Sequence, residues 1–369
     1  MVSARIHSKR SSRQVSTRET GVSAPLIGAL VCGTAAGLIA RTILARRRSA
    51  HSLRGQVVFI TGGSRGLGLS LAETFANEGC RVAICARDAM ELEAARRQLD
   101  HGGSILAVPC DVADQRQVER TVDSVIAQFG RIDVLVNNAG EIQVGPVQSM
   151  TLEDFENAMD VMFWGTVYPS MAVLPHVLER GTGRIVNITS IGGKVAVPHL
   201  LPYTCAKFAA VGFSEGLRAE LAGKGIHVVT IAPGLMRTGS YLNALFKGDQ
   251  EREAVWFSLG ATLPGISMGA RRAARQIVNA TKRGDAERIL TVPARWLARF
   301  HGLFPGLAAD LLSVVNHYVL PSGTDKGSMR GREATVLRKP WMQALTVLGR
   351  IAARRFLEES KQQAAPARM

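Results

Sequence analysis

Short apolar runs alternate with amphipathic stretches through the middle of the chain. The runs have the length of buried strands, whereas the amphipathic stretches repeat apolar residues at helical spacing. This alternation predicts parallel βαβ units and a doubly wound α/β sheet with helices on both faces. Strands are expected over residues 56–60, 81–86, 104–110, 133–140, 184–190, 226–234 and 288–293, and helices over residues 69–80, 88–100, about 114–129 and 203–222.

The alternation stops after residue 293. Residues 294–321 are apolar and contain aromatic side chains, which indicates a helical extension, and residues 321–333 have the composition of a flexible linker. Residues 341–360 are amphipathic and basic on one side, as expected of a helix that lies on a membrane surface or covers a core groove or a partner subunit. The expected units are a basic N-terminal tail (1–54), an α/β domain (55–293), an apolar helical extension (294–320) and a basic linker with an amphipathic helix (321–369).

The net charge of +15 is concentrated at the two ends of the chain. Residues 1–54 carry +9 and residues 321–369 carry +6, whereas residues 55–320 contain 25 basic and 25 acidic side chains. A nucleic-acid-binding fold usually carries its basic patch on the folded domain, so we expect no nucleic-acid partner. Basic tails beside a neutral domain are more typical of contact with anionic membrane surfaces, or of solvated ends.

The cysteines and the overall composition exclude several further classes of protein. The five cysteines are an odd number without CxxC spacing, which argues against a disulfide scaffold or a zinc ribbon and favours a reducing compartment. Because 46% of the 369 residues are hydrophobic and 20% are charged, a large core is available. A wholly disordered or collagen-like chain is therefore excluded.

Residues 21–40 form a charge-free stretch with the length of a bilayer crossing. Its content of Gly, Ala, Ser and Thr weakens that interpretation. A membrane anchor, a removable targeting peptide and an apolar helix packed on protein all remain open, and we favour the anchor. Each flank carries five basic residues, so the charges do not orient it.

A glycine-rich turn follows the first expected strand and opens the first expected helix. Glycines let the backbone approach a pyrophosphate closely, and the helix N-terminus offers free N–H groups and a partial positive charge. Glycine turns also serve packing, but the strand before and the helix after favour nucleotide binding. The expected contacts are Thr61, Gly62, Ser64, Arg65, Gly66, Leu67 and Gly68.

The residues at the end of the second expected strand bear on the choice between NAD(H) and NADP(H). A carboxylate there would bind the adenosine ribose hydroxyl of NAD, but the strand ends in Ala86 and Arg87, with no acid before Asp88. Arg65 lies in the glycine turn, so two guanidinium groups are placed to meet a 2′-phosphate. We therefore expect NADP(H), against the alternative that both arginines are ordinary solvated side chains.

Ser190, Tyr203 and Lys207 form the third constellation. Tyr203 and Lys207 are four residues apart on an expected helix and share a face, while Ser190 ends a strand at the carboxyl edge of the sheet. A phenol titrates near pH 10, and a neighbouring ammonium favours its ionised form. Tyr203 is then suited to exchange a proton with a carbonyl or alcohol oxygen.

These motifs, in this order, resemble the classical short-chain dehydrogenase/reductase family over about residues 55–292. The resemblance implies a seven-stranded parallel Rossmann sheet and assembly into dimers or tetramers. It is carried by TGGSRGLG (61–68), CDV (110–112), NNAG (137–140), Ser190, YTCAK (203–207) and PGLMRT (233–238).

The resemblance also implies roles for single residues. Tyr203 would be the general acid/base, Lys207 would lower its pKa and bind the nicotinamide ribose, and Ser190 would hydrogen-bond the substrate oxygen. Further cofactor contacts are implied for Asp111 and Val112 beside the adenine, for Asn138, Ala139 and Gly140 along the cofactor, and for Pro233, Gly234 and Thr238 near the nicotinamide.

One position departs from the family pattern. The family usually has an Asn in a D-V-N-x-x-G stretch, where this chain has Met162. That Asn helps hold a water that joins the active-site lysine to solvent. A thioether cannot donate a hydrogen bond and accepts one weakly, so proton transfer through this position is in doubt.

Together these features predict an NADP(H)-dependent oxidoreductase acting on a carbonyl/alcohol pair. Residues 239–268 are rich in Leu, Phe, Trp and Met and are expected over the active site, which favours a small lipophilic substrate or, alternatively, packing within the fold. We also expect a homo-oligomer, with the catalytic domain on the cytoplasmic side of the membrane or soluble in the cytoplasm. The competing hypothesis is a non-catalytic nucleotide-binding or scaffold protein on the same fold.

Overall fold

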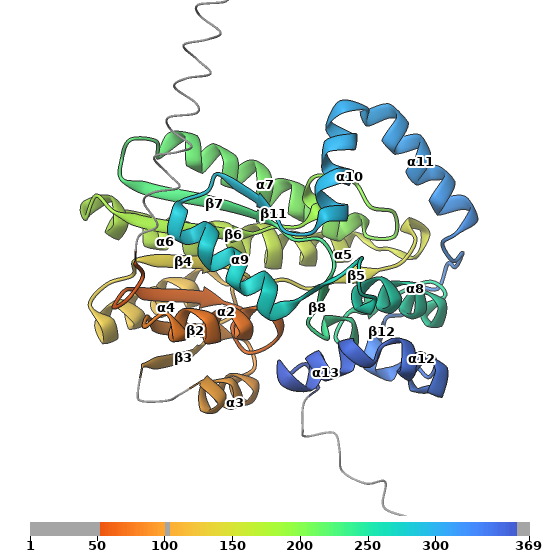
Figure 1. The fold of residues 1–369 in the computed structure, drawn as a ribbon, viewed down its shortest axis with the longest axis horizontal. Coiled ribbons are helices and arrows are strands. Elements are labelled where there is room, and N and C mark those ends of the chain that lie inside the picture. Colours follow the sequence, from red (N-terminus) through yellow and green to blue (C-terminus); the bar gives the residue numbers. More distant parts are fainter. Residues whose placement is uncertain (1–51, 100–103, 360–369) are drawn as a thin grey trace, which may run out of the picture. The chain divides into compact units, whose positions relative to one another are not determined.

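The computed structural model describes residues 52–99 and 104–359 (Figure 1). The anchor expected at residues 21–40 lies outside the described residues.

The central element is a sheet of seven parallel strands in the order β11-β7-β6-β4-β1-β2-β3. All side chains of β1 are buried, and so are those of β4 and β6. Buried faces on both sides explain why these strands are continuous apolar runs rather than alternating ones. The strands are β1 (Val57–Thr61), β2 (Arg81–Ala86), β3 (Ile105–Pro109), β4 (Val134–Asn137), β6 (Gly183–Ile188), β7 (Ile226–Ala232) and β11 (Glu287–Ile289).

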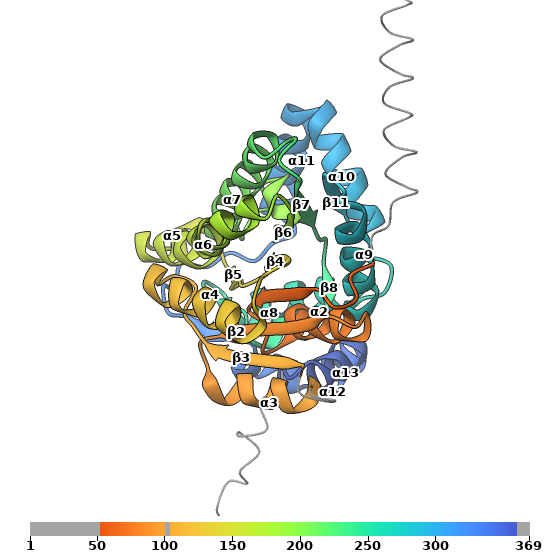
Figure 2. The same cartoon turned by 90° about the vertical axis from the view of Figure 1, so that its left-hand side faces the viewer.

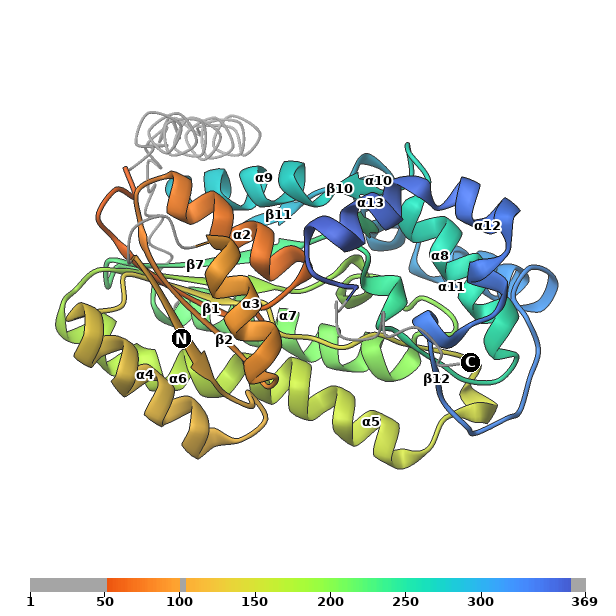
Figure 3. The same ribbon diagram turned by 90° about the horizontal axis from the view of Figure 1, so that it is seen from below.

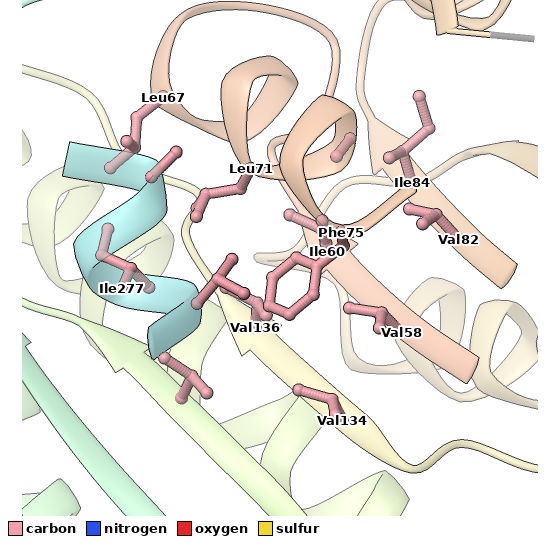
Figure 4. Close-up of a cluster of buried hydrophobic side chains, with 14 of the residues drawn as sticks. Val58, Ile60, Leu67, Leu71, Phe75, Val82, Ile84, Val134, Val136 and Ile277 are labelled. Atoms are coloured by element: carbon pink, nitrogen blue, oxygen red, sulfur yellow. The ribbon is translucent and has the colours of Figure 1, made fainter. Parts of the chain in front are cut away.

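Helices cover both faces of this sheet (Figure 2). On one face, Leu71 and Phe75 of the first helix and Ile277 of a later one pack onto the strands (Figure 4). On the other face, Val122 and Val177 belong to a second buried cluster. The first face carries α2 (Gly66–Asn77), α3 (Ala89–Leu99) and α9 (Ala270–Arg283), and the second carries α4 (Gln115–Phe129), α6 (Gly165–Glu179) and α7 (Leu201–Glu220).

Helix α4 illustrates how local sequence sets these helices. The Asp114 side chain accepts a hydrogen bond from the Gln117 N–H and caps the N-terminus, while Gly130, with φ of 81°, ends the helix. Val118, Val122 and Val125 recur at helical spacing and are buried against the sheet.

The chain changes direction across the sheet between β1 and β4. From β1 it runs outward through β2 to β3, and β4 then pairs with the opposite side of β1. Helix α2 leaves β1 on one face and α6 precedes β6 on the other. Loops that diverge in this way open a crevice at the carboxyl ends of β1 and β4, which is where open α/β sheets bind ligands.

A smaller region forms beside this edge. Tyr241, Phe246 and Phe257 make its buried core. The aromatic residues of 239–268, expected to cover a substrate, therefore pack within the fold. This region contains β5 (Gln143–Val144), β8 (Met236–Arg237), β9 (Leu245–Phe246), β10 (Met268–Gly269), β12 (Met329–Arg330), the 3-10 helices η1 (Val147–Ser149), η3 (Ile191–Gly193), η4 (Ser240–Leu242), η5 (Gly331–Glu333) and η6 (Val336–Arg338), and the helix α8 (Gln250–Thr262).

The C-terminal segments differ from expectation in two places. Residues 321–333, expected as a flexible linker, contain β12, which pairs antiparallel with β9. The helix expected over 341–360 is two helices separated at Thr346, α12 (Pro340–Leu345) and α13 (Val347–Arg355), and both contact α8 (Figure 3). The apolar extension is helical as expected, forming α10 (Val292–Leu303) and α11 (Pro305–Tyr318).

The continuous helical stretch Leu152–Glu179 joins α5 (Leu152–Met159), the π-helix η2 (Asp160–Trp164) and α6. Among the described residues, it alone is long and apolar enough to cross a membrane by length and composition. Its second half packs against α4, β4 and β6, and Val173 and Val177 are buried there. Packing on the sheet thus accounts for its apolar face.

Candidate active site

The glycine-rich loop and the end of β4 are tied together by hydrogen bonds. The Thr61 hydroxyl accepts the backbone N–H groups of Asn138 and Ala139, at 3.0 and 3.1 Å. The Asn138 amide donates to the backbone carbonyls of Thr61 and Gly62, both at 3.0 Å. These contacts join the two strand ends that border the crevice, so Thr61 and Asn138 position the loop.

Two glycines are required by this close approach. Gly62 has φ of 64°, and a Cβ there would lie 2.8 Å from Ala139 Cα. A Cβ at Gly68 would overlap the Gly62 carbonyl oxygen. The loop therefore presents bare backbone at the N-terminus of α2, where Arg65 has an extended backbone and makes no side-chain cap. Such a cradle fits a dinucleotide pyrophosphate.

The two arginines expected to read the 2′-phosphate have different surroundings. Arg65 Nη1 donates to both carboxylate oxygens of Glu91, at 2.8 Å, and Arg65 Nε lies 3.5 Å from Glu358 Oε2. Arg87 directly follows β2, is 58% exposed, and has its nearest carboxylate, that of Glu141, at 3.9 Å. Arg87 is therefore the more available guanidinium.

Asp111 and Val112 lie just beyond β3, close to the carboxyl end of β2. The Asp111 carboxylate accepts the Ala113 N–H at 3.1 Å, while the Asp111 N–H donates to the Gln117 side chain. Val112 is buried, and a Cβ at Gly165 would lie 2.7 Å from its Cγ2. The turn after β3 is thus held firmly in place.

The residues after β7 reach the same edge. The Pro233 carbonyl accepts the Ile191 N–H at 2.8 Å, next to Ser190. Thr238 is buried, and its Cβ lies 3.8 Å from the position of a Cβ at Gly66. Gly234 is enclosed, because a Cβ there would overlap the Thr291 hydroxyl.

Ser190, Tyr203 and Lys207 converge at the carboxyl end of β6. Ser190 follows this strand and its hydroxyl accepts the Gly192 N–H at 3.0 Å, while a Cβ at Gly192 would lie 3.2 Å from Tyr203 Cε1 and 3.5 Å from Ser190 Oγ. Lys207, one turn along α7, is buried and donates to the Ile188 carbonyl at 3.0 Å. The structure brings together the three side chains that the sequence singled out.

The electrostatics of this trio differ from expectation. Burial raises the pKa of Tyr203, and a hydrogen bond with Ser190 acts in the opposite direction. Burial also lowers the pKa of Lys207 to about 8. The Lys207 Nζ lies 5.8 Å from the centroid of the Tyr203 ring and donates to a backbone carbonyl. Desolvation, rather than the ammonium, therefore dominates the pKa of the phenol.

Met162 is buried within the π-helix η2. A Cβ at Gly140 would lie 3.8 Å from Met162 Sδ and 3.7 Å from Lys207 Nζ, so the thioether and the ammonium flank the same glycine. The Met162 carbonyl accepts the Thr166 hydroxyl at 2.8 Å. The departure found in the sequence therefore lies beside the candidate catalytic lysine.

We expect Met162→Asn to hold or raise kcat, because an amide can donate and accept hydrogen bonds beside Lys207 where a thioether cannot. Steady-state kinetics and a thermal melt measure this, with Met162→Leu as the apolar control. A severe loss of kcat in a folded Met162→Asn protein would show instead that the site is built around the thioether.

Sequence reasoning missed a carboxylate cluster at Arg65. Glu91 lies in the first turn of α3, and Glu358 lies beyond α13. Glu91 could have been found from the sequence, because it follows Arg87 closely at the end of the second expected strand. Nothing local in the sequence placed Glu358 there.

The chain is similar in sequence to known proteins. The family profile described as short chain dehydrogenase matches residues 56–244. The chain is 40% identical over 212 residues to a dehydrogenase/reductase SDR family protein 7-like of Anopheles gambiae, covering 55% of this chain and 66% of that protein. It is 37% identical over 187 residues to D-threitol dehydrogenase of Mycolicibacterium smegmatis, covering 50% and 72%.

A solved structure is also similar. The short-chain dehydrogenase from Streptomyces avermitilis superposes with a TM-score of 0.63 at 27% identity, covering 73% of this chain and all of that one. The matched region spans 66% of the Anopheles gambiae protein and 61% of its Drosophila melanogaster counterpart. The likeness therefore concerns the α/β domain.

Proposed function

The chain belongs to the short-chain dehydrogenase/reductase family, a family of oxidoreductases that use nicotinamide cofactors, and from this premise we propose that it is an NADP(H)-dependent carbonyl reductase or alcohol dehydrogenase. The observation that carries the proposal is the convergence of Ser190, Tyr203 and Lys207 at the sheet edge that also bears the glycine loop. Nucleotide binding alone would not require these three side chains to lie together.

The cofactor supplies the hydride when bound. The glycine loop would hold its pyrophosphate, Asp111 and Val112 would lie beside its adenine, Asn138 to Gly140 would line it, and Thr238 would lie near its nicotinamide. Tyr203 gives its hydroxyl proton to the substrate oxygen in reduction and takes a proton back in oxidation. Ser190 donates a hydrogen bond to the same oxygen, and Lys207, with a pKa of about 8, titrates close to neutral pH.

The preference for NADP(H) rests on Arg87. Its guanidinium is exposed, stands where an NAD-binding carboxylate would stand, and suits a 2′-phosphate by charge and planar geometry. Arg65 is shared with Glu91 and Glu358, so its contribution is smaller.

We expect NADPH to bind at least about tenfold more tightly than NADH, and Arg87→Ala to remove most of that ratio by weakening NADPH alone. Titration of the protein with both nucleotides measures it. Arg97→Ala is the matched control, because Arg97 is an exposed arginine on α3 that pairs with Glu93. Equal affinities of the wild-type protein for the two nucleotides would contradict the proposal.

A cavity of about 690 Å³ supports a lipophilic substrate. This volume is in the range of small-molecule sites. It reaches Leu201 at the start of α7, and α11 forms one wall, whereas Ser190, Tyr203 and Lys207 do not line it. Its apolar lining includes Val147, Val197, Leu201, Leu312 and Leu320. The residues at 239–268 do not line it.

A substrate panel tests the proposed reaction. Purified protein is mixed with NADPH and ketones or aldehydes of increasing chain length, and NADPH absorbance is followed. We expect turnover, with kcat/KM rising with the length of the apolar chain. Tight NADPH binding without turnover of any carbonyl, or of alcohols with NADP⁺, would favour the non-catalytic nucleotide-binding protein instead.

Membrane association and oligomerisation extend the proposal. Helices α10 and α11 expose large apolar side chains, among them Trp296, Leu303, Leu311 and Tyr318, as expected at a lipid or protein surface. A reductase that draws on NADPH would place its catalytic domain in the cytoplasm.

Large apolar side chains are also exposed around α6 and α7. They are Trp164 at the end of η2, Met171 on α6 and Phe208 on α7, and they favour a homo-oligomer that forms through these helices.

A further inference from the structure

The segment Phe356–Glu358, just beyond α13, lies on the glycine-rich loop. The Gly66 N–H donates a hydrogen bond of 2.8 Å to the Phe356 carbonyl oxygen. A Cβ at Gly66 would lie 2.5 Å from Glu358 Oε1, so the carboxylate rests against the first residue of α2. The Phe356 carbonyl oxygen and the Glu358 carboxylate therefore both lie at the N-terminus of α2.

Contacts on both sides hold the segment there. The Phe356 and Glu358 N–H groups donate to the carbonyls of Ala352 and Ala353, both at 2.9 Å. Leu357 has φ of 55°, in the left-handed region that favours glycine, and its side chain packs against the core cluster formed with α2 and α9. The Arg355 carbonyl accepts the Gln98 amide at 3.1 Å.

Glu358 is buried among polar partners. Its carboxylate and its backbone carbonyl both accept the Asn243 amide, the latter at 3.1 Å. Arg65 Nε is 3.5 Å from Glu358 Oε2, and the opposite end of that guanidinium is held by Glu91. The carboxylate thus engages the same arginine that flanks the glycine loop.

The segment uses the groups that a nucleotide needs. A pyrophosphate at this loop requires free N–H groups at the start of α2 and positive charge nearby, and both are engaged by the segment. The Gly66 N–H cannot bond the Phe356 carbonyl oxygen and a pyrophosphate oxygen at the same time. We propose that Phe356–Glu358 is an autoinhibitory plug of the cofactor site, which must leave before the nucleotide binds. This inference rests on the nucleotide site of the proposed function.

Removing the carboxylate tests the plug. When only the open fraction of the protein binds, the apparent Kd is the intrinsic Kd divided by that fraction. We expect Glu358→Ala to lower the apparent Kd for NADPH at least about fivefold. Glu359→Gln is the matched control, because Glu359 is the next residue and pairs with Arg354 instead, so its Kd should not change. Weaker binding by Glu358→Ala would overturn the proposal and make Glu358 a part of the cofactor site.

The plug also predicts a pH dependence. Burial raises the pKa of Glu358 to about 7, and the groups that face it are Arg65, Asn243, Glu91 and Arg332. The Glu358 carboxyl binds its proton more tightly when the segment lies on the glycine-rich loop than when the segment is released. The segment is therefore held on the loop less strongly as pH rises toward 7. We expect nucleotide affinity to rise with pH between about 5 and 7 by at most about tenfold per unit, relative to Glu358→Gln. The ratio of the two proteins removes the titration of the nucleotide phosphate, and a flat ratio would overturn this switch.

Hydrogen exchange separates displacement from closure. With NADPH bound, we expect faster exchange at the amides of Phe356 and Glu358, because their bonds to α13 loosen when the segment leaves. Unchanged or slower exchange, with NADPH bound tightly, overturns the plug and leaves the proposed function intact. If neither the wild-type protein nor Glu358→Ala binds NADPH, both proposals fall.

Discussion

Tyr203→Phe is expected to lower kcat by about 10³-fold or more and to leave NADPH binding within about twofold. The substitution removes only the hydroxyl that exchanges the proton, and a 10³-fold loss corresponds to about 4 kcal/mol of transition-state stabilisation. The ring keeps its packing beside Gly192 and against the cluster around Tyr241. Steady-state kinetics on the best carbonyl substrate, with a separate nucleotide titration, measure both quantities.

Tyr168→Phe is the matched control for the loss of a phenol. Tyr168 lies on α6, packs with the cluster on the other face of the sheet and stacks on Trp164 at 5.3 Å between ring centroids. Its kcat should stay near that of the wild-type protein. If Tyr203→Phe retains more than about a tenth of the activity, the proton is handled by another group and the assignment of Tyr203 is wrong.

Asp133→Ala is expected to lower the free energy of unfolding by about 2–4 kcal/mol, because it removes hydrogen bonds to charged groups and leaves a buried N–H unpaired. The Asp133 carboxylate accepts the Val57 N–H at 2.8 Å and the Arg131 Nε at 2.9 Å, and it pairs with Arg180. Its loss leaves the buried Val57 N–H unpaired at the start of β1. Urea denaturation measures the change, and Asp123→Ala, at an exposed position of α4, should stay within about 0.5 kcal/mol of the wild-type value.

The Asp133 effect should depend on pH in a defined direction. Burial alone would raise the pKa of this carboxyl, but the hydrogen bonds from Val57, Arg131 and Arg180 lower it. A lowered pKa in the folded state means that the stabilisation is present above the unfolded value, near 3.9, and is lost as pH falls through the folded value. The wild-type and Asp133→Ala stabilities should therefore converge only below about pH 4. A difference that shrinks already between pH 7 and 5 would contradict this assignment.

Much of the fold could be read from local pattern. Each of the seven expected strands overlaps a strand of the central sheet, because continuous apolar runs are what a sheet covered on both faces requires. The glycine loop was recognisable for a similar reason. The collision that a side chain at Gly62 or Gly68 would cause restricts those positions to glycine, and the restriction is visible in the sequence.

The pKa of Tyr203 could not be read in this way. The four-residue spacing placed Tyr203 and Lys207 on one face, and that spacing predicted a phenol whose pKa the ammonium lowers. Burial of both groups decides the direction instead, and burial depends on everything that packs around α7. For residues 239–268, apolar composition did not distinguish a substrate cover from a core, and the structure places Tyr241, Phe246 and Phe257 in a buried cluster against which Tyr203 packs.

By itself, the sequence determined the parallel α/β sheet, the glycine-rich loop and the trio of Ser190, Tyr203 and Lys207, because each depends on short-range spacing and on the common carboxyl edge of the strands. Only the tertiary structure decided that Glu358 reaches Arg65 and Gly66, and that α11 walls the cavity near α7. These contacts join residues far apart in the chain. Their formation depends on how α13 and α11 pack as whole helices, for which the residues themselves carry no local signal.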